Sequence, residues 1–214
     1  MTARSRRAER FTGRIGAFGT GSGTRVVLGL WERSPFGAFA DAMIEDARGH
    51  RTLLAPRAEV ADFVAATYSF DEVRIVPLRV WRIRGGLAVG DGMHDAGGGA
   101  APAFRARLLA GRLTPLGRVL RAVPSRLATS PAWLTAVDPV ARILVPGVRT
   151  AGTAGGGRRE YYGVTAVRSI VWAEAHLDGR DLGAFGPLAP PVRFGFGSAP
   201  ASPALVDLTT TVTR

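Results

Sequence analysis

The chain has 214 residues, of which 46% are hydrophobic and 21% are charged, a balance that suits a globular domain and argues against wholesale disorder. Cysteine is absent, which excludes disulfides, zinc–thiolate centres, iron–sulfur clusters and catalytic thiols. All 28 basic residues are arginine, so the net charge of +11 comes without any lysine, and every mechanism that needs a lysine side chain is excluded.

The N-terminal part of the chain predicts short strands and one helix. Residues 1–9 carry several arginines and are typical of a basic tail. Three segments have the β-branched or alternating pattern of strands, namely residues 11–18, 24–31 and 38–46. Apolar side chains at helical spacing after Pro56 predict an amphipathic helix over residues 56–68.

The middle of the chain predicts further strands and then a helical segment. Residues 73–84 read as one long strand that is apolar on both faces at its centre, in which Pro77 implies a bulge or an edge position. Residues 91–102 are a glycine-rich loop, and residues 103–109 alternate as a strand. Over residues 115–145, leucines and valines at helical spacing are interrupted by prolines, which predicts two or three short helices.

The C-terminal part returns to strands. Residues 151–158 are a glycine-rich loop, and residues 160–177 predict one or two strands. Asp178 and Gly179 form a two-residue hairpin signal, and the threonine-rich residues 205–212 predict the last strand.

These elements predict a mainly β (α+β) fold, an antiparallel β-barrel or sandwich of about ten strands with two or three helices. We expect a basic tail over residues 1–9 and a single β-rich domain over residues 10–214, with a helical insertion at about 115–145. No stretch approaches the roughly 18 apolar residues of a membrane span. The charged N-terminus is not followed by the apolar segment of a secretory signal, so we expect a cytoplasmic protein.

Two predicted strand faces mix polar and apolar side chains. The first carries Asp41 and Glu45, and the second carries Arg168, Glu174 and His176. On an outer wall these are ordinary half-solvated strands. If they face the lumen of a barrel, they line an amphiphilic ligand cavity in which Asp41, Glu45 and Glu174 act as acid–base groups or polar anchors.

Several arginines are candidates to hold an anionic group. In a barrel cavity these are Arg25, Arg168 and Arg193. The run at residues 155–160 joins three glycines to Arg158 and Arg159, and its exposed amides and guanidinium groups can hold a phosphate or carboxylate. The alternative for this run is a hairpin whose arginines are solvated.

No cofactor or metal site is predicted. The glycine-rich residues 16–23 precede a strand where a dinucleotide fold needs a helix, and a phosphate-binding P-loop lacks its lysine. The three histidines are not at metal-binding spacing from one another. Asp91, His94 and Asp95 lie together in a glycine-rich loop, which we interpret as a surface turn rather than a hydrolytic metal site.

The segment Ser-Pro-Phe-Gly-Ala-Phe at residues 34–39, entering an alternating strand, resembles the Ser-Pro-x-Gly-x-aromatic entry of acetoacetate-decarboxylase-like proteins. The order of many strands, one early helix and a late proline-rich return is also similar to that family. The resemblance implies a closed, conical antiparallel barrel around a small-molecule cavity. The family's decarboxylases use a lysine Schiff base, which this chain cannot form, so no catalytic residue is carried over.

Our leading hypothesis is therefore a small-molecule-binding β-barrel protein, enzymatic or not, that takes a small organic ligand. One alternative is a nucleic-acid-binding protein, motivated by the net charge of +11 and the arginine-rich tail. Against it, only 8% of residues are aromatic, no recognition motif is present, and the arginines are spread along the chain as a compositional bias would spread them. A second alternative is a non-catalytic interaction protein that docks a partner or a membrane through residues 115–145.

We predict that borohydride traps no adduct between the protein and acetoacetate or another small keto acid. The only primary amine is the N-terminal one, and no apolar segment before Phe11 can bury and orient it. Intact-mass spectrometry after reduction checks this. A stoichiometric adduct would contradict the exclusion and restore Schiff-base chemistry.

Overall fold

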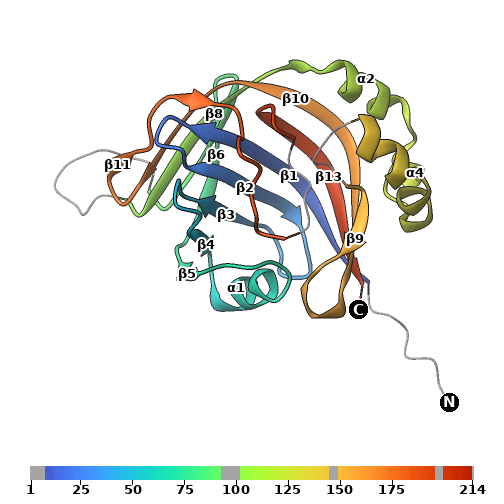
Figure 1. Cartoon of the computed structure of the whole chain (residues 1–214), viewed down its shortest axis with the longest axis horizontal. Coiled ribbons are helices and arrows are strands. Elements are labelled where there is room, and N and C mark those ends of the chain that lie inside the picture. The colour runs from blue at the N-terminus through green and yellow to red at the C-terminus, as the bar shows by residue number, and fades with distance from the viewer. Residues whose placement is uncertain (1–7, 93–101, 145–148, 196–199, 214) are drawn as a thin grey trace.

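The computed structural model describes residues 8–92, 102–144, 149–195 and 200–213 (Figure 1). Most of them lie in strands, which in chain order are β1 (Ala8–Thr20), β2 (Arg25–Arg33), β3 (Phe39–Glu45), β4 (Arg51–Ala55), β5 (Glu72–Ile75), β6 (Arg79–Ile83), β7 (Gly86–Gly90), β8 (Phe104–Leu113), β9 (Ala151–Thr153), β10 (Arg159–Leu177), β11 (Arg180–Asp181), β12 (Phe185–Gly186) and β13 (Ala204–Thr213). The helices are α1 (Ala58–Ala65), α2 (Pro115–Ala122), α3 (Ser125–Ala128), α4 (Pro131–Leu144) and the 3-10 turn η1 (Gly155–Gly157).

The strands form one 13-stranded sheet in the order β5-β4-β3-β2-β1-β13-β10-β8-β7-β6, with β9, β11 and β12 paired beside this path. Within the described residues the fold is mainly β with helices, as the sequence predicts. Neighbouring strands are antiparallel apart from β4 and β5, which run parallel because α1 crosses between them. The sheet is strongly curved in Figure 1, but its pairing does not close into a barrel, since β5 and β6 lie at its two edges.

The predicted long strand over residues 73–84 is interrupted, and the break shapes the whole sheet. Pro77 has no N–H to give to a ladder, and β5 ends just before it while β6 begins just after. Because β5 and β6 belong to opposite edges, a link of three residues, at most ~10 Å long, holds the two edges near each other. Val76 and Leu78 on this link pack into the main core.

Other boundaries follow the sequence pattern with small differences. Strand β1 begins at Ala8, and residues 1–7 of the expected tail lie outside the described residues, as do residues 93–101 of the expected loop. Strand β10 is one continuous 19-residue strand. It turns into β11 through Asp178 and Gly179, both with positive φ, as the hairpin signal predicts.

The two faces of the curved sheet carry separate cores. Along β3, Ala40, Ala42 and Ile44 point into the main core with side chains of β2, β7, β8 and β10. Phe39 points to the opposite face, where it packs with the apolar side of α1 and with side chains of β1, β4 and β13. Strands that are buried on both faces read as nearly continuous apolar runs, as β2 does. The second face carries the candidate site.

We predict that Gly117→Ala destabilises the protein by about 1–3 kcal/mol because it overpacks the contact between α2 and β10. A Cβ at Gly117 would lie 2.2 Å from the carbonyl oxygen and 2.8 Å from the amide nitrogen of Val167. Alanine is normally about 1 kcal/mol better than glycine in a helix, so the clash reverses the usual sign. Urea unfolding measures the change. The control is Gly186→Ala in β12, where a Cβ meets no atom within 4 Å. Equal stability of the two variants would contradict this packing.

Candidate functional site

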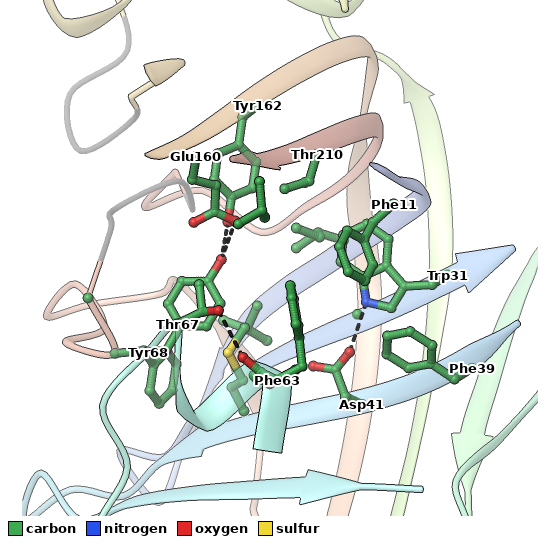
Figure 2. Close-up of a pocket in the computed structure, with 18 of the residues that line it drawn as sticks. Phe11, Trp31, Phe39, Asp41, Phe63, Thr67, Tyr68, Glu160, Tyr162 and Thr210 are labelled. Atoms are coloured by element: carbon green, nitrogen blue, oxygen red, sulfur yellow. Dashed lines mark hydrogen bonds between the residues drawn. The ribbon is translucent and has the colours of Figure 1, made fainter. Parts of the chain in front are cut away.

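A cavity of about 70 Å³ lies between the second face of the sheet, helix α1 and residues 192–195 (Figure 2). On the same measure a single water needs roughly 10–15 Å³, so the cavity has room for a small organic molecule. Its wall is mostly apolar and aromatic, with Phe11, Phe39 and Phe63 among the residues that line it. The polar groups gather at two ends, one around Asp41 and the other around Glu160.

The first end is built by the β2–β3 pair. Asp41 lies opposite Gly29 in the register, and its Oδ1 accepts a hydrogen bond of 2.9 Å from Trp31 Nε1. A Cβ at Gly29 would lie 2.3 Å from that oxygen and 2.7 Å from the indole nitrogen. Glycine is therefore the residue that leaves room for the Trp31–Asp41 bond. Among the described side chains, Trp31 is the hydrogen-bond partner of the Asp41 carboxyl group. Asp41 is 3% exposed.

The second end is built by β10, β13 and Tyr68, which lies three residues after the end of α1. The β10–β13 register sets Tyr162 opposite Thr210 and Glu160 opposite Val212, so Glu160, Tyr162 and Thr210 share one face. Tyr68 Oη donates to Glu160 Oε1 over 2.7 Å and lies 2.5 Å from Tyr162 Oη. Figure 2 shows Tyr68, Glu160 and Tyr162 converging at one end of the site while Asp41 and Trp31 lie at the other.

Two polar atoms at the second end have no hydrogen-bond partner in the described protein. Glu160 Oε2 and Thr210 Oγ1 are both buried, and both residues line the cavity. A buried polar atom without a partner costs about 1–3 kcal/mol relative to a satisfied one. Both atoms have almost no accessible surface, so a ligand in the cavity reaches them when the side chains of Glu160 and Thr210 turn toward it.

Burial shifts both carboxyl groups toward their neutral form. Desolvation raises the pKa of Glu160 to about 7, with hydrogen bonds from Tyr68 and Tyr162 and the charge of Arg158 opposing it. Desolvation likewise raises the pKa of Asp41 to about 6, opposed by the Trp31 hydrogen bond. Burial and the neighbouring Glu160 charge raise the pKa of Tyr68 well above its ordinary value, so Tyr68 stays a hydrogen-bond donor.

Three of the predicted site residues form an ion-pair cluster. Glu45 Oε1 lies 3.1 Å from both Arg25 Nη2 and Arg193 Nε, and Glu45 Oε2 accepts from the Arg193 backbone N–H over 2.7 Å. Arg25 also donates to the carbonyl oxygens of Asp46 and Pro190. This cluster fastens the 190–193 segment to the ends of β2 and β3, and these charges do not line the cavity described above.

The glycine–arginine run is likewise engaged with the fold. Arg158 is buried, donates to Phe63 O and to Thr67 Oγ1, and lies 4.8 Å from the centroid of the Phe63 ring. It thereby holds the C-terminal end of α1 against β10. Arg159 is exposed and its guanidinium lies 5.8 Å from the Tyr161 ring centroid.

The predicted second face lies away from the cavity. Arg168 and His176 are half-buried, and Glu174 forms an ion pair of 3.3 Å with Arg107 on the neighbouring strand. Irregularities in the β10–β8 register on either side of Ile170 separate this part of β10 from the part that carries Glu160. The structure thus brings Asp41 alone of the nine predicted residues to the cavity wall.

The remaining polar groups of the cavity were missed by the sequence reasoning. Their signals are present in the chain, since alternation places Glu160 and Tyr162 on one face of a strand and Gly29 opens a gap in an apolar strand. Tyr68 is the last residue of the predicted amphipathic helix, and only the fold brings it to Glu160. The contact between Tyr68 and Glu160 could not be predicted, because no sequence pattern links residues that lie so far apart in the chain.

In the part of the chain that the structure describes, no three histidine or acidic side chains are grouped to hold a metal ion. His94 and Asp95 of the loop singled out above lie outside these residues, and Asp91 accepts hydrogen bonds from the backbone N–H groups of Ala103 and Phe104. None of the described helices has the length and apolar character to cross a bilayer.

Comparison with protein-family models and with curated proteins gives no match. Among solved structures, the chain is similar to acetoacetate decarboxylase from Legionella pneumophila, with 10% sequence identity and a TM-score of 0.44 over 100% of this chain and 88% of that one. We transfer no residue role or activity from it.

We predict that the protein is less stable at pH 8 than at pH 5 and that Glu160→Gln removes about 2–3 kcal/mol of this difference. The folded pKa of Glu160 is raised from 4.5 to about 7, so between these values the native state binds more protons than the unfolded state and stability falls as the pH rises. Asp41 adds a smaller decline between pH 5 and 6.

The measurement is the free energy of unfolding in urea at the two pH values. Glutamine keeps the acceptor for Tyr68 and removes the titrating proton. Glu174→Gln, at a partly exposed ion pair outside the cavity, is the matched control and should leave the pH dependence as in the wild type. A wild-type protein that is equally stable at both values would contradict the assigned burial.

Proposed function

We propose that the protein binds a small, uncharged molecule in this cavity through one oxygen of the ligand. The observation that carries the proposal is the pair of buried atoms, Glu160 Oε2 and Thr210 Oγ1, that lack partners in the described protein and belong to residues of the same apolar cavity. A carbonyl or hydroxyl oxygen that reaches either atom would satisfy it, and the aromatic wall would cover the rest of the ligand.

The charges around the cavity favour a neutral ligand over the anionic ligand that the sequence left open as one possibility. Among the described residues that line it, the ionisable groups are two carboxyls and two tyrosines, with no arginine. Arg25 and Arg193 are held by Glu45 instead. An anion would enter a desolvated space next to carboxyl groups and without a contacting cation, which is strongly unfavourable.

The two alternatives that the sequence left open, a nucleic-acid-binding protein and a non-catalytic interaction protein, have weaker support. Several arginines pair with carboxylates of their own fold, including Arg14, Arg51, Arg74 and Arg107, so much of the positive charge is locally balanced and a nucleic-acid role is less favoured. The described helices at 115–144 expose Val119, Val140 and Ile143, but nothing on this surface indicates which partner would cover it.

The proposal predicts that cyclopentanone raises the melting temperature, whereas cyclopentylamine and cyclopentanecarboxylate at the same concentration do not. The three probes share one ring and differ in charge at neutral pH, and stabilisation follows from selective binding to the native state. Because ligands of this size bind weakly, about 10 mM of each probe is appropriate. Stabilisation by the carboxylate or the amine alone, or by none of the three, would contradict the proposal.

A substitution at Thr210 separates binding from folding. Thr210→Val removes the unpartnered hydroxyl, so we expect it to raise the ligand-free stability by about 1 kcal/mol and to weaken the cyclopentanone-induced shift. Thr209→Val is the matched control, since Thr209 Oγ1 points to the other face of β13 and lies 3.3 Å from Thr12 Oγ1. The control should lower stability slightly and leave the ligand-induced shift unchanged.

A further inference from the structure

The two polar ends of the cavity have opposite chemical character. Asp41 receives one hydrogen bond, from Trp31, and lies against the aromatic wall. At the other end, Tyr68 donates to Glu160 Oε1, which leaves Glu160 Oε2 as the free position of that carboxyl group. A carboxylate that faces a set of hydrogen-bond donors across an apolar space is an arrangement for moving a proton within a bound molecule.

We propose that this cavity catalyses proton transfer at a carbon next to the carbonyl group of a small neutral ketone, with Asp41 as the base and Glu160 as the donor to the carbonyl oxygen. The inference rests on the proposed function, because it requires the ligand oxygen to lie at the Glu160 end. Tyr68 acts through Glu160 and is a positioning residue.

The reaction is balanced without any further reactant. The Asp41 carboxylate takes the α-proton, the C–H electron pair becomes the new C=C bond, and the carbonyl π pair moves to oxygen. The enolate oxygen is stabilised by the proton on Glu160 Oε2 and by the Thr210 hydroxyl. Asp41 then returns a proton to the same carbon, or to the far end of a conjugated system, and the enzyme regains its starting state.

The protonation states that this step needs are those that burial favours near neutral pH. Asp41, with a pKa raised to about 6, is mostly ionised at pH 7 and is a stronger base than an exposed aspartate. Glu160, with a pKa raised to about 7, keeps a proton on a large fraction of molecules. The working form is therefore most populated between about pH 6 and 7.

The groups that can influence this pH dependence are few among the described residues. The titratable side chains of the cavity wall are Asp41, Glu160, Tyr68 and Tyr162. Arg158, the residue before β10, acts on Glu160 through its charge beside the end of α1. Arg149 lines two neighbouring hollows, one sharing Tyr162 and the other sharing Tyr68 with the cavity, but it does not line the cavity itself.

The test is the exchange of the α-protons of cyclopentanone for deuterium in heavy water, followed by NMR with and without the protein. We expect the protein to accelerate exchange, with a bell-shaped pH profile whose maximum lies between about 6 and 7. Asp41→Asn should lower the rate by at least ~100-fold, since asparagine keeps the Trp31 hydrogen bond but is not a base. Glu160→Gln should lower the maximum and abolish the decline above pH 7.

The thermal-shift assay with cyclopentanone distinguishes a failure of the catalytic inference from a failure of the proposed binding function. If cyclopentanone stabilises the protein but its exchange is no faster than in buffer, the catalytic inference is wrong and the binding function stands. If cyclopentanone does not bind, both fail. Exchange that is insensitive to Asp41→Asn, or a Glu160→Gln profile that still declines above pH 7, would also overturn the inference. Glu174→Gln should behave as the wild type in every assay.

Discussion

The register between β10 and β13 is the constraint on which the site depends. It places Glu160, Tyr162 and Thr210 on one face of two neighbouring strands, and it continues from β13 through β1 and β2 to β3, where Asp41 points to that same face. A shift of one residue in the β10–β13 pairing would turn Glu160 and Tyr162 to the opposite side. The three-residue link around Pro77 joins the two edges of the sheet, and helix α1 and residues 192–195 cover this face and leave a cavity.

The buried carboxyl groups show how the chain treats charge in its interior. Glu45 is fully buried, and two arginines with several hydrogen bonds compensate it, as a structural ion pair requires. Asp138 accepts hydrogen bonds from backbone N–H groups. Asp41 and Glu160 lie beside the cavity, and desolvation raises the pKa values of both, although the charge of Arg158 opposes this at Glu160. A fold that keeps two buried carboxyl groups with raised pKa values beside one cavity concentrates its electrostatic strain at a functional site. This contrast supports assigning function to these two groups.

The fold class could be predicted from the sequence because strands, helices and turns are indicated by patterns within short segments. Alternation identified β3, helical spacing identified α1, and the Asp178–Gly179 signal identified the β10–β11 turn. Pro77 was expected to mark a bulge or an edge position, and the strands on either side of it are edge strands. That they belong to opposite edges of the sheet cannot be read from a local pattern. Asp41 was found because it interrupts an apolar strand face, whereas Tyr68 and Glu160 are 92 positions apart and are joined only by the fold. The ion pairs of Arg25 and Arg193 with Glu45 could not be predicted, because a charged side chain looks the same in sequence whether it binds a ligand or a carboxylate of its own chain.

The central claim is that the free oxygen of Glu160 and the hydroxyl of Thr210 receive the oxygen of a neutral ligand inside the cavity. A crystal structure of the protein with cyclopentanone at about pH 6.5 tests it most directly. The account predicts the ring against Phe11 and Phe63, with the ketone oxygen within about 2.6–3.2 Å of Glu160 Oε2 and its α-carbon facing Asp41. A cavity that holds only water bonded to Glu160 and Thr210, with the ketone bound elsewhere or not at all, would contradict the account.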